Sequence, residues 1–107
     1  MAPDIDAASV PDDARILDVR EPAEWAAGHV AGSQHLPIGE IVTRVDEIDD
    51  AAGTIVVVCR SGYRSAQVTA WLQGQGYDAV NLAGGLDAWA QAGRPLVTDS
   101  GEPGRVA

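Results

Sequence analysis

Residues 54–67 read TIVVVCRSGYRSAQ, and this segment gives the clearest indication of the fold. Its first five residues are all β-branched and almost entirely apolar, a pattern typical of a central parallel strand that is covered on both faces. The run ends at Cys59, the only cysteine in the chain, and Arg60 and Arg64 follow closely. The stretch therefore predicts a buried strand over residues 54–58 that brings a thiol to a cationic loop.

Strand and helix patterns alternate on both sides of this stretch. The strand patterns are ARILDV (14–19), SQHLP (33–37) and DAVNL (78–82), and the helix patterns are EPAEWAAGH (21–29), GEIVTRVDEID (39–49), SAQVTAWLQGQG (65–76) and GLDAWAQAG (85–93). This order predicts an α/β fold with a parallel sheet, right-handed crossovers and helices on both faces. Ligand sites in such sheets lie at the carboxyl ends of the strands, which is where Cys59 stands.

Apolar spacing and helix-end residues support the helix patterns. Pro22 and Gly28 bracket the first helix, as helix termini favour. Ile41, Val45 and Ile48 follow the i, i+4, i+7 spacing of an amphipathic helix. The tryptophans fall on helical faces and are expected in the core: Trp25, Trp71 and Trp89.

Length, charge and cysteine content limit the function classes. A chain of 107 residues has room for one domain, which we expect to span residues 1–107, with a core over about 5–97 and a flexible tail over 98–107. The net charge of -9 argues against nucleic acid or an anionic membrane as a partner. The N-terminus lacks the features of a signal peptide, and a single cysteine fits a reducing compartment, so a cytoplasmic location is expected.

The loop after Cys59 has the composition of a site for a negatively charged sulfur species. Backbone N–H groups at a helix N-terminus have no helical partner, so the amides from Arg60 to Ser65 are expected to surround the sulfur, with Gly62 permitting the tight curvature. These donors, together with Arg60 and Arg64, favour a thiolate over a thiol whose free pKa is ~8.5. A buried, inert cysteine is the alternative, but a purely structural strand end has no need of two guanidinium groups.

Three segments together resemble a known family. CRSGYRS (59–65) resembles the active-site loop of rhodanese-domain sulfurtransferases, and ILDVREPAEWAAGHVAGSQHLP (16–37) and LAGGLDAWAQAGRPL (82–96) are similar to two further signatures of that family. The resemblance extends over about residues 14–96. It implies a rhodanese-like three-layer fold with a mostly parallel central sheet of about five strands.

The resemblance implies a two-step sulfur transfer of the ping-pong kind without a metal or an organic cofactor. The Cys59 thiolate would attack the outer sulfur of a small anionic donor such as thiosulfate, releasing sulfite and leaving a persulfide on Cys59. A thiol, a protein acceptor or cyanide would then remove the outer sulfur. The activity expected is that of a thiosulfate:cyanide sulfurtransferase.

The resemblance also assigns roles to the loop residues. Arg60 and Arg64 are expected to orient the donor, the hydroxyls of Ser61 and Ser65 to donate to the persulfide, and Tyr63 to influence selectivity. The backbone around Gly62 completes the cradle.

Residues outside the loop have structural roles in this interpretation. Asp18 and Arg20 match the family's strand signature and are expected to form an ion pair at the end of the sheet. His29 and His35 lack ligand partners at suitable spacing, so no metal site is predicted.

Two other functions remain open at this point. One is a non-catalytic rhodanese interaction or sulfur-carrier module. The other is a cysteine-dependent phosphatase, which is disfavoured because phosphatase loops of this fold are one residue longer between the cysteine and the arginine.

Overall fold

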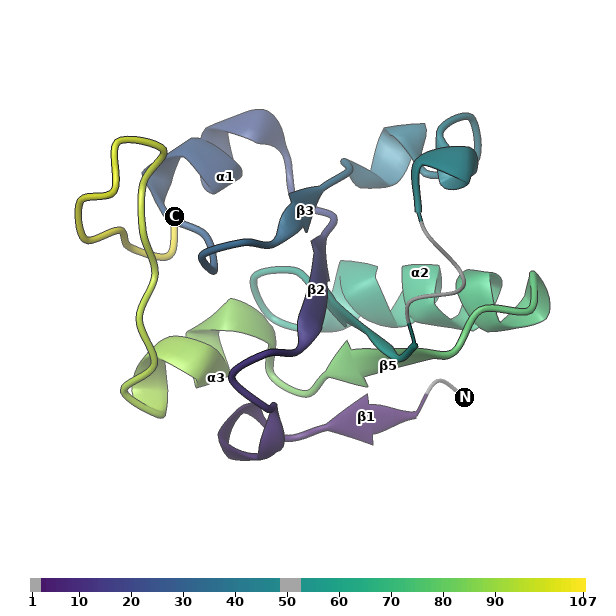
Figure 1. Cartoon of the computed structure of the whole chain (residues 1–107), viewed down its shortest axis with the longest axis horizontal. Helices are drawn as coiled ribbons and strands as arrows, with labels where there is room; N and C mark the ends of the chain where they lie inside the picture. Colours follow the sequence, from purple (N-terminus) through teal and green to yellow (C-terminus); the bar gives the residue numbers. More distant parts are fainter. Residues whose placement is uncertain (1–2, 49–52) are drawn as a thin grey trace.

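A parallel sheet of five strands runs through the centre of the structure, a computed structural model that describes residues 3–48 and 53–107 (Figure 1). The strands lie in the order β1-β5-β4-β2-β3 and every neighbouring pair is parallel. Their bounds are β1 Asp4–Ile5, β2 Arg15–Asp18, β3 Gln34–His35, β4 Ile55–Val58 and β5 Ala79–Leu82. The predicted α/β class and parallel sheet are confirmed.

The central strand, β4, divides two hydrophobic cores. All four of its residues are buried, and their side chains alternate between the two faces of the sheet. Ile55 and Val57 pack in the core beneath α2, whereas Val56 and Val58 pack in the core beneath α3. The unbroken apolar run is therefore explained by burial on both sides, as the sequence predicted.

Within the described residues, three α-helices surround the sheet: α1 Pro22–Ala27, α2 Tyr63–Gly74 and α3 Gly85–Gln91 (Figure 1). Pro22 begins α1 and Gly28 follows its last residue, as predicted. The expectation that all three tryptophans lie in the core holds only for Trp89, which is buried, because Trp25 and Trp71 are half-buried at the margins.

The predicted helix over residues 39–49 is wrong. The segment forms two 3₁₀ turns, η2 Ile38–Glu40 and η3 Val45–Glu47, joined by further turns, and residue 49 lies outside the described residues. Three consecutive β-branched residues, positions 41–43, favour helix weakly. The apolar stripe was nonetheless informative, since Ile41 and Ile48 are buried in the α2-side core.

Residues near both ends of the chain make backbone contacts with the rest of the structure. Residues 4–5 form the edge strand β1, which pairs with β5, and η1 Ala7–Ser9 follows. Near the other end, His29 and Val97 exchange backbone hydrogen bonds of 2.9 and 2.8 Å, and Arg105 N–H donates to Ala27 O at 2.9 Å. Arg105, in the segment 98–107, thus contacts the carboxyl end of α1.

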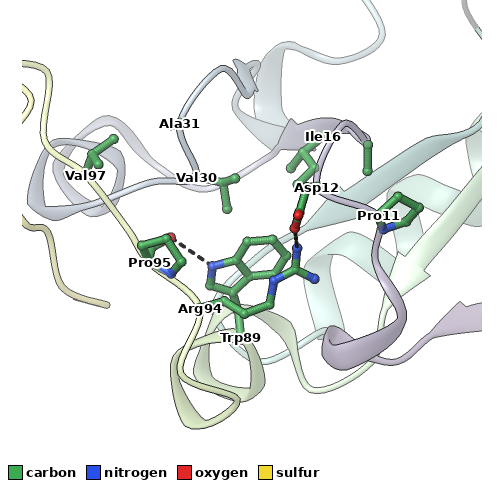
Figure 2. Close-up of a pocket in the computed structure, with 10 residues that line it drawn as sticks. Pro11, Asp12, Ile16, Val30, Ala31, Trp89, Arg94, Pro95 and Val97 are labelled. Carbon is green, nitrogen blue, oxygen red and sulfur yellow. Dashed lines mark hydrogen bonds and ion pairs between the residues drawn. The ribbon is translucent and has the colours of Figure 1, made fainter.

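Arg94 fastens the N-terminal segment to α3 beside a cavity of about 190 Å³ (Figure 2). Its guanidinium lies 4.0 Å from the centre of the Trp89 ring and donates to the carbonyl oxygens of Ala7 and Val10 at 2.7 and 2.6 Å. Asp12 forms an ion pair with the same group at 3.1 Å. The lining of this cavity includes no residue of the Cys59 loop.

No helix within the described ranges is long and apolar enough to cross a bilayer.

The turn into α3 holds the backbone of the Cys59 loop. Leu86 N–H donates to Cys59 O at 2.9 Å, and Asp87 N–H donates to Arg60 O at 3.0 Å. Gly85 makes this approach possible, because it has a φ of +62° and a Cβ at that position would lie 2.5 Å from Arg60 O. The first turn of α3 thus fixes the position of the loop.

Gly85→Ala is expected to lower the free energy of unfolding by about 2–4 kcal/mol, because a left-handed backbone is strained and the Arg60 carbonyl must also move. Gly93→Ala is the matched control: Gly93 has a φ of +76° but no atom within 4 Å of a built Cβ. It should cost only about 1–2 kcal/mol. Urea unfolding measures both, and equal losses would contradict the role assigned to the contact with Arg60.

Candidate active site

Cys59 lies immediately after β4 and its sulfur is enclosed by hydrogen-bond donors. The residue exposes none of its surface. Its Sγ accepts from Gly62 N–H at 3.1 Å, Ser65 N–H at 3.4 Å and Ser65 Oγ at 3.2 Å. These donors are available because Gly62 turns the chain with a φ of +98° and α2 begins at Tyr63, which leaves the first-turn amides without helical partners. The loop is thus folded around the sulfur.

The donors favour the charged form of the thiol. Burial raises the pKa of Cys59, because it disfavours a thiolate. Hydrogen bonds from the Ser65 hydroxyl and from the amides of Ser65, Gly62 and Ser61 act in the opposite direction and outweigh burial, so the pKa lies below its ordinary value. A larger thiolate fraction at neutral pH follows.

The donors next to Sγ differ from the side chains at the outside of the loop. Within the described residues, Gly62 and Ser65 supply the donors at 3.1 to 3.4 Å from Sγ, and the Ser61 amide also lowers the pKa of Cys59. Ser61 and Tyr63 are exposed, as is the Arg60 side chain, whose Nε lies 3.8 Å from an oxygen of Asp87. These three side chains form the outer rim of the loop.

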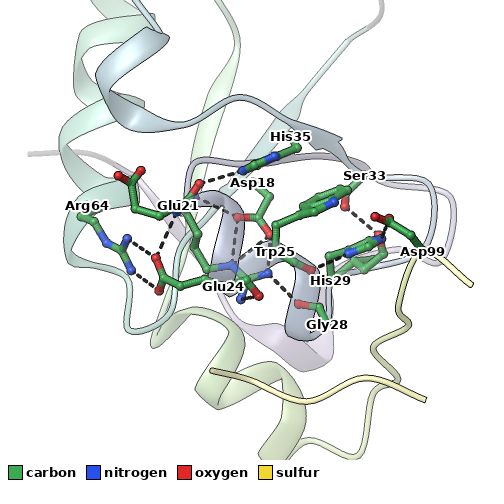
Figure 3. A network of polar contacts seen from close by, with 12 residues as sticks. Asp18, Glu21, Glu24, Trp25, Gly28, His29, Ser33, His35, Arg64 and Asp99 are labelled. Atoms are coloured by element: carbon green, nitrogen blue, oxygen red, sulfur yellow. Dashed lines mark hydrogen bonds and ion pairs between the residues drawn. The ribbon is translucent and has the colours of Figure 1, made fainter. Parts of the chain in front are cut away.

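Arg64 is engaged by a carboxylate of α1. Its guanidinium donates to both carboxylate oxygens of Glu24, at 2.7 and 2.8 Å (Figure 3). The hydrogen bonds from Arg64 are the main cause that lowers the pKa of Glu24 to about 2, and the pKa of Arg64 is raised in return. Glu24 also accepts from Glu21 N–H at 3.0 Å. The Glu24–Arg64 ion pair therefore connects α2, the helix that follows the Cys59 loop, to α1.

Asp18 and Arg20 form the buried ion pair that their sequence predicted. Arg20 Nη2 lies 2.8 Å from Asp18 Oδ2, and neither side chain is exposed. Arg20 also donates to the carbonyl oxygens of Gly28 and Glu24 at 2.7 and 3.2 Å. Because Asp18 is paired with Val58 in the sheet, the Asp18–Arg20 ion pair lies beside the end of β4. Through Arg20 it connects the end of β2 to α1.

The two histidines pack against Trp25. The Trp25 ring is stacked on His29 and His35, with ring centres 3.6 and 4.6 Å apart (Figure 3). One nitrogen of His29 bonds to Trp25 O at 2.9 Å, and one of His35 bonds to Arg20 O at 2.8 Å. Within residues 3–48 and 53–107, no three His, Cys, Asp or Glu side chains are grouped so that they could hold a metal ion.

Sequence reasoning missed three side chains of this site. Asn81 of β5 lies 2.6 Å from Ser65 Oγ through its Oδ1, and Asp4 of β1 accepts from Asn81 Nδ2 at 3.1 Å. No local pattern signals these two residues, because only the parallel register of β1 and β5 places Asp4 opposite Asn81. For Glu24 a signal existed: an acidic residue in the first turn after Pro22 is typical of a capping box.

The Glu24–Arg64 ion pair is expected to make the free energy of unfolding depend on pH in the acidic range. The pKa of Glu24 is about 2 in the folded chain against an ordinary 4.5. The contribution of Glu24 to the free energy of unfolding is therefore complete above pH 4.5 and is lost as pH falls towards 2. Its upper limit is about 3 kcal/mol.

Urea unfolding between pH 6 and pH 2 tests this dependence. The stability gap between the unmodified protein and Glu24→Gln should shrink as pH falls through that window. Glu102→Gln, which alters an exposed carboxylate, should show no such narrowing. A Glu24→Gln gap that is constant with pH would exclude the Glu24–Arg64 ion pair as the cause.

Comparisons with known proteins agree with the geometry. The rhodanese-like domain family matches residues 4–92. A sulfurtransferase of Allochromatium vinosum is 43% identical over 91 residues, which cover 84% of each chain. The thiosulfate sulfurtransferase GlpE of Pseudomonas putida is 36% identical over 87 residues, covering 80% of this chain and 77% of the relative.

A solved structure shares the architecture. The crystal structure of a rhodanese-related protein from Thermoplasma volcanium superposes with a TM-score of 0.85 at 31% identity, covering 91% of this chain and 99% of the other. The family match, the sulfurtransferase relatives and the shared fold all point the same way, and the chain therefore belongs to the rhodanese-like domain family, in which its relatives support rhodanese-type sulfur transfer in general.

Proposed function

We propose that the protein is a sulfurtransferase that moves a sulfane sulfur from thiosulfate, or from another persulfide donor, to a thiol or cyanide through a persulfide on Cys59. The observation that carries this proposal is the sulfur at the carboxyl end of β4, which accepts hydrogen bonds from Gly62 and Ser65. These donors stabilise a negative charge on sulfur, which the reaction requires in the thiolate and in the persulfide.

The first step forms an S–S bond and breaks another. The Cys59 thiolate attacks the outer sulfur of thiosulfate, and the bond inside thiosulfate breaks, so that sulfite leaves with the bonding electron pair. The product is a Cys59 persulfide whose outer sulfur is negatively charged. Electrons balance without an external oxidant, because one S–S bond replaces another.

The second step regenerates the thiolate. An acceptor thiolate or cyanide attacks the outer sulfur of the persulfide, the bond to Cys59 Sγ breaks, and its electron pair returns to Sγ. The product is an acceptor persulfide or thiocyanate. Because Cys59 is the only cysteine, the sulfur passes to another molecule rather than to a second thiol in the same chain.

The two arginines have different surroundings and therefore different roles in this proposal. The Arg60 side chain is 56% exposed, with its nearest carboxylate 3.8 Å away. It is the better placed to attract an anionic donor and to stabilise departing sulfite. Arg64 is held by Glu24, so its part is to maintain the loop and to favour a negative charge on Cys59.

Access to the sulfur depends on the rim of the loop. Because Cys59 has no exposed surface, a donor reaches it only when rim side chains shift. Ser61 and Tyr63 are exposed rim residues, and Tyr63 at 74% exposure is positioned to contact an acceptor. The Tyr63 side chain is our candidate for acceptor selectivity. A thiol acceptor would suit a reaction that takes place in the reducing cytoplasm, the location we propose.

Cys59→Ser is expected to abolish the conversion of thiosulfate and cyanide to sulfite and thiocyanate, because a serine hydroxyl does not form the persulfide. Intact-mass spectrometry after treatment with thiosulfate should show one added sulfur on the unmodified protein and none on the variant. Arg60→Ala should keep the added sulfur but require a higher thiosulfate concentration. Circular dichroism checks that the variants remain folded.

Two measurements separate the alternatives. In the mass spectrometry experiment, a non-catalytic module would stay unmodified by thiosulfate. In a separate hydrolysis assay, a phosphatase would hydrolyse an aryl phosphate in a Cys59-dependent manner. Thiocyanate formation by Cys59→Ser at an undiminished rate would overturn the mechanism.

A further inference from the structure

The hydroxyl of Ser65 has one proton and two acceptors within reach. Its Oγ lies 2.6 Å from Asn81 Oδ1 and 3.2 Å from Cys59 Sγ. Both Ser65 and Cys59 expose none of their surface, and Asn81 is 5% exposed. Since water has little access to this hydroxyl, it must donate its hydrogen bond either to Asn81 or to the sulfur.

The orientation of the Asn81 amide is determined by two further contacts. Its Nδ2 donates to Asp4 Oδ1 at 3.1 Å and to Gly62 O at 3.3 Å. Both partners are acceptors, so the amide nitrogen faces them and Oδ1 faces Ser65. The shorter contact of Ser65 is the one to Asn81, so in the resting thiol the hydroxyl donates to Asn81.

The thiol and the thiolate need different arrangements of this proton. When Cys59 is a thiol, S–H donates to Ser65 Oγ and the Ser65 hydroxyl donates to Asn81 Oδ1, which satisfies all three groups. When Cys59 is a thiolate, the hydroxyl gains more by turning towards Sγ, and Asn81 Oδ1 loses its donor. Asn81 therefore competes with the charged sulfur for the proton.

We propose that Asn81 is a positioning residue that accepts the hydrogen bond of the Ser65 hydroxyl when Cys59 is a thiol. When Cys59 becomes a thiolate or a persulfide, the hydroxyl turns and donates to the sulfur instead. Asp4 maintains the orientation of the Asn81 amide. The inference deepens the proposed function, because it assumes that Cys59 is the reacting group. The geometry that carries it is the chain of contacts from Asp4 through Asn81 and Ser65 to Cys59.

Other charges also act on the thiol, and the test must leave them unchanged. The titratable and charged groups on the elements around the site include Asp4, Arg15, Asp18, Arg20, Glu21, Glu24, His35, Arg60, Tyr63, Arg64 and Asp87. The charge of Arg64 is among those that interact with Cys59. Substitution of Asn81 by an uncharged residue changes the charge of none of these groups, although it removes the hydrogen bond from Asn81 to Asp4.

The test measures the pKa of the Cys59 thiol from the pH dependence of alkylation by iodoacetamide. Asn81→Val removes the competing acceptor, so the Ser65 proton is available to the sulfur in both states. The pKa is expected to fall by about 0.5–1 unit, the size of one hydrogen bond. The measurement needs no sulfur transfer, so its result is independent of whether the proposed function is correct.

A double-mutant cycle separates the proton from the packing of the loop. In a Ser65→Ala background the hydroxyl is absent, so Asn81→Val should leave the pKa of Cys59 unchanged. A residue that only supports the loop would shift the pKa in both backgrounds, or raise it by loosening the Gly62 amide. Either result would overturn the proposal, as would an unchanged pKa in the Ser65 background.

A surface pair provides a second test if Asn81→Val does not fold. Asp4 is exposed, and Asp4→Asn and Asp4→Ala remove the same charge, but only the alanine removes the acceptor for Asn81 Nδ2. The Cys59 pKa should be lower in Asp4→Ala than in Asp4→Asn, because the freed amide holds Oδ1 towards Ser65 less firmly. Equal values in the two variants would contradict the orienting role of Asp4.

Discussion

The loop that carries Cys59 is held by the amino ends of two helices that bind different atoms of it. First-turn amides of α2 donate to the sulfur, whereas the Leu86 and Asp87 amides of α3 donate to the carbonyl oxygens of Cys59 and Arg60. Helix amino ends have N–H groups without partners, and here they are satisfied by the loop that joins β4 to α2. The arrangement requires close backbone approach, which Gly85 permits. The position of the thiol therefore depends on both faces of the sheet.

Ion pairs extend this support to the first helix. Asp18–Arg20 is fully buried at the end of β2, and Glu24–Arg64 joins α1 to α2. A buried ion pair adds little to stability, because the Coulomb attraction mainly offsets desolvation, but the loss of one partner leaves a costly unpaired charge. Such pairs favour one arrangement of the elements over others. In a chain of net charge -9, two of the arginines near the thiol, Arg20 and Arg64, are thus engaged in ion pairs that organise the site.

These constraints explain how a buried thiol can have a pKa below its ordinary value. Burial alone would raise the pKa of Cys59 and make it inert, but the Ser65 and Gly62 donors reverse the direction. The same donors suit the persulfide of the proposed reaction, since its outer sulfur is also an anion. Asn81 adds a group that satisfies the Ser65 hydroxyl when the sulfur is neutral, so the site is compatible with both charge states.

Local burial patterns and short spacings were sufficient to predict the alternation of strands and helices, the central strand over 54–58 and Cys59 at its end. The Asp18–Arg20 ion pair was expected from the resemblance to the family's strand signature. The sequence predicted a helix over 39–49 wrongly, since the apolar stripe indicates burial without specifying backbone geometry. Only the tertiary structure brought Asp4 to Asn81, 77 residues apart, and Glu24 to Arg64, 40 residues apart. Such contacts depend on strand register and helix packing, which no local pattern encodes.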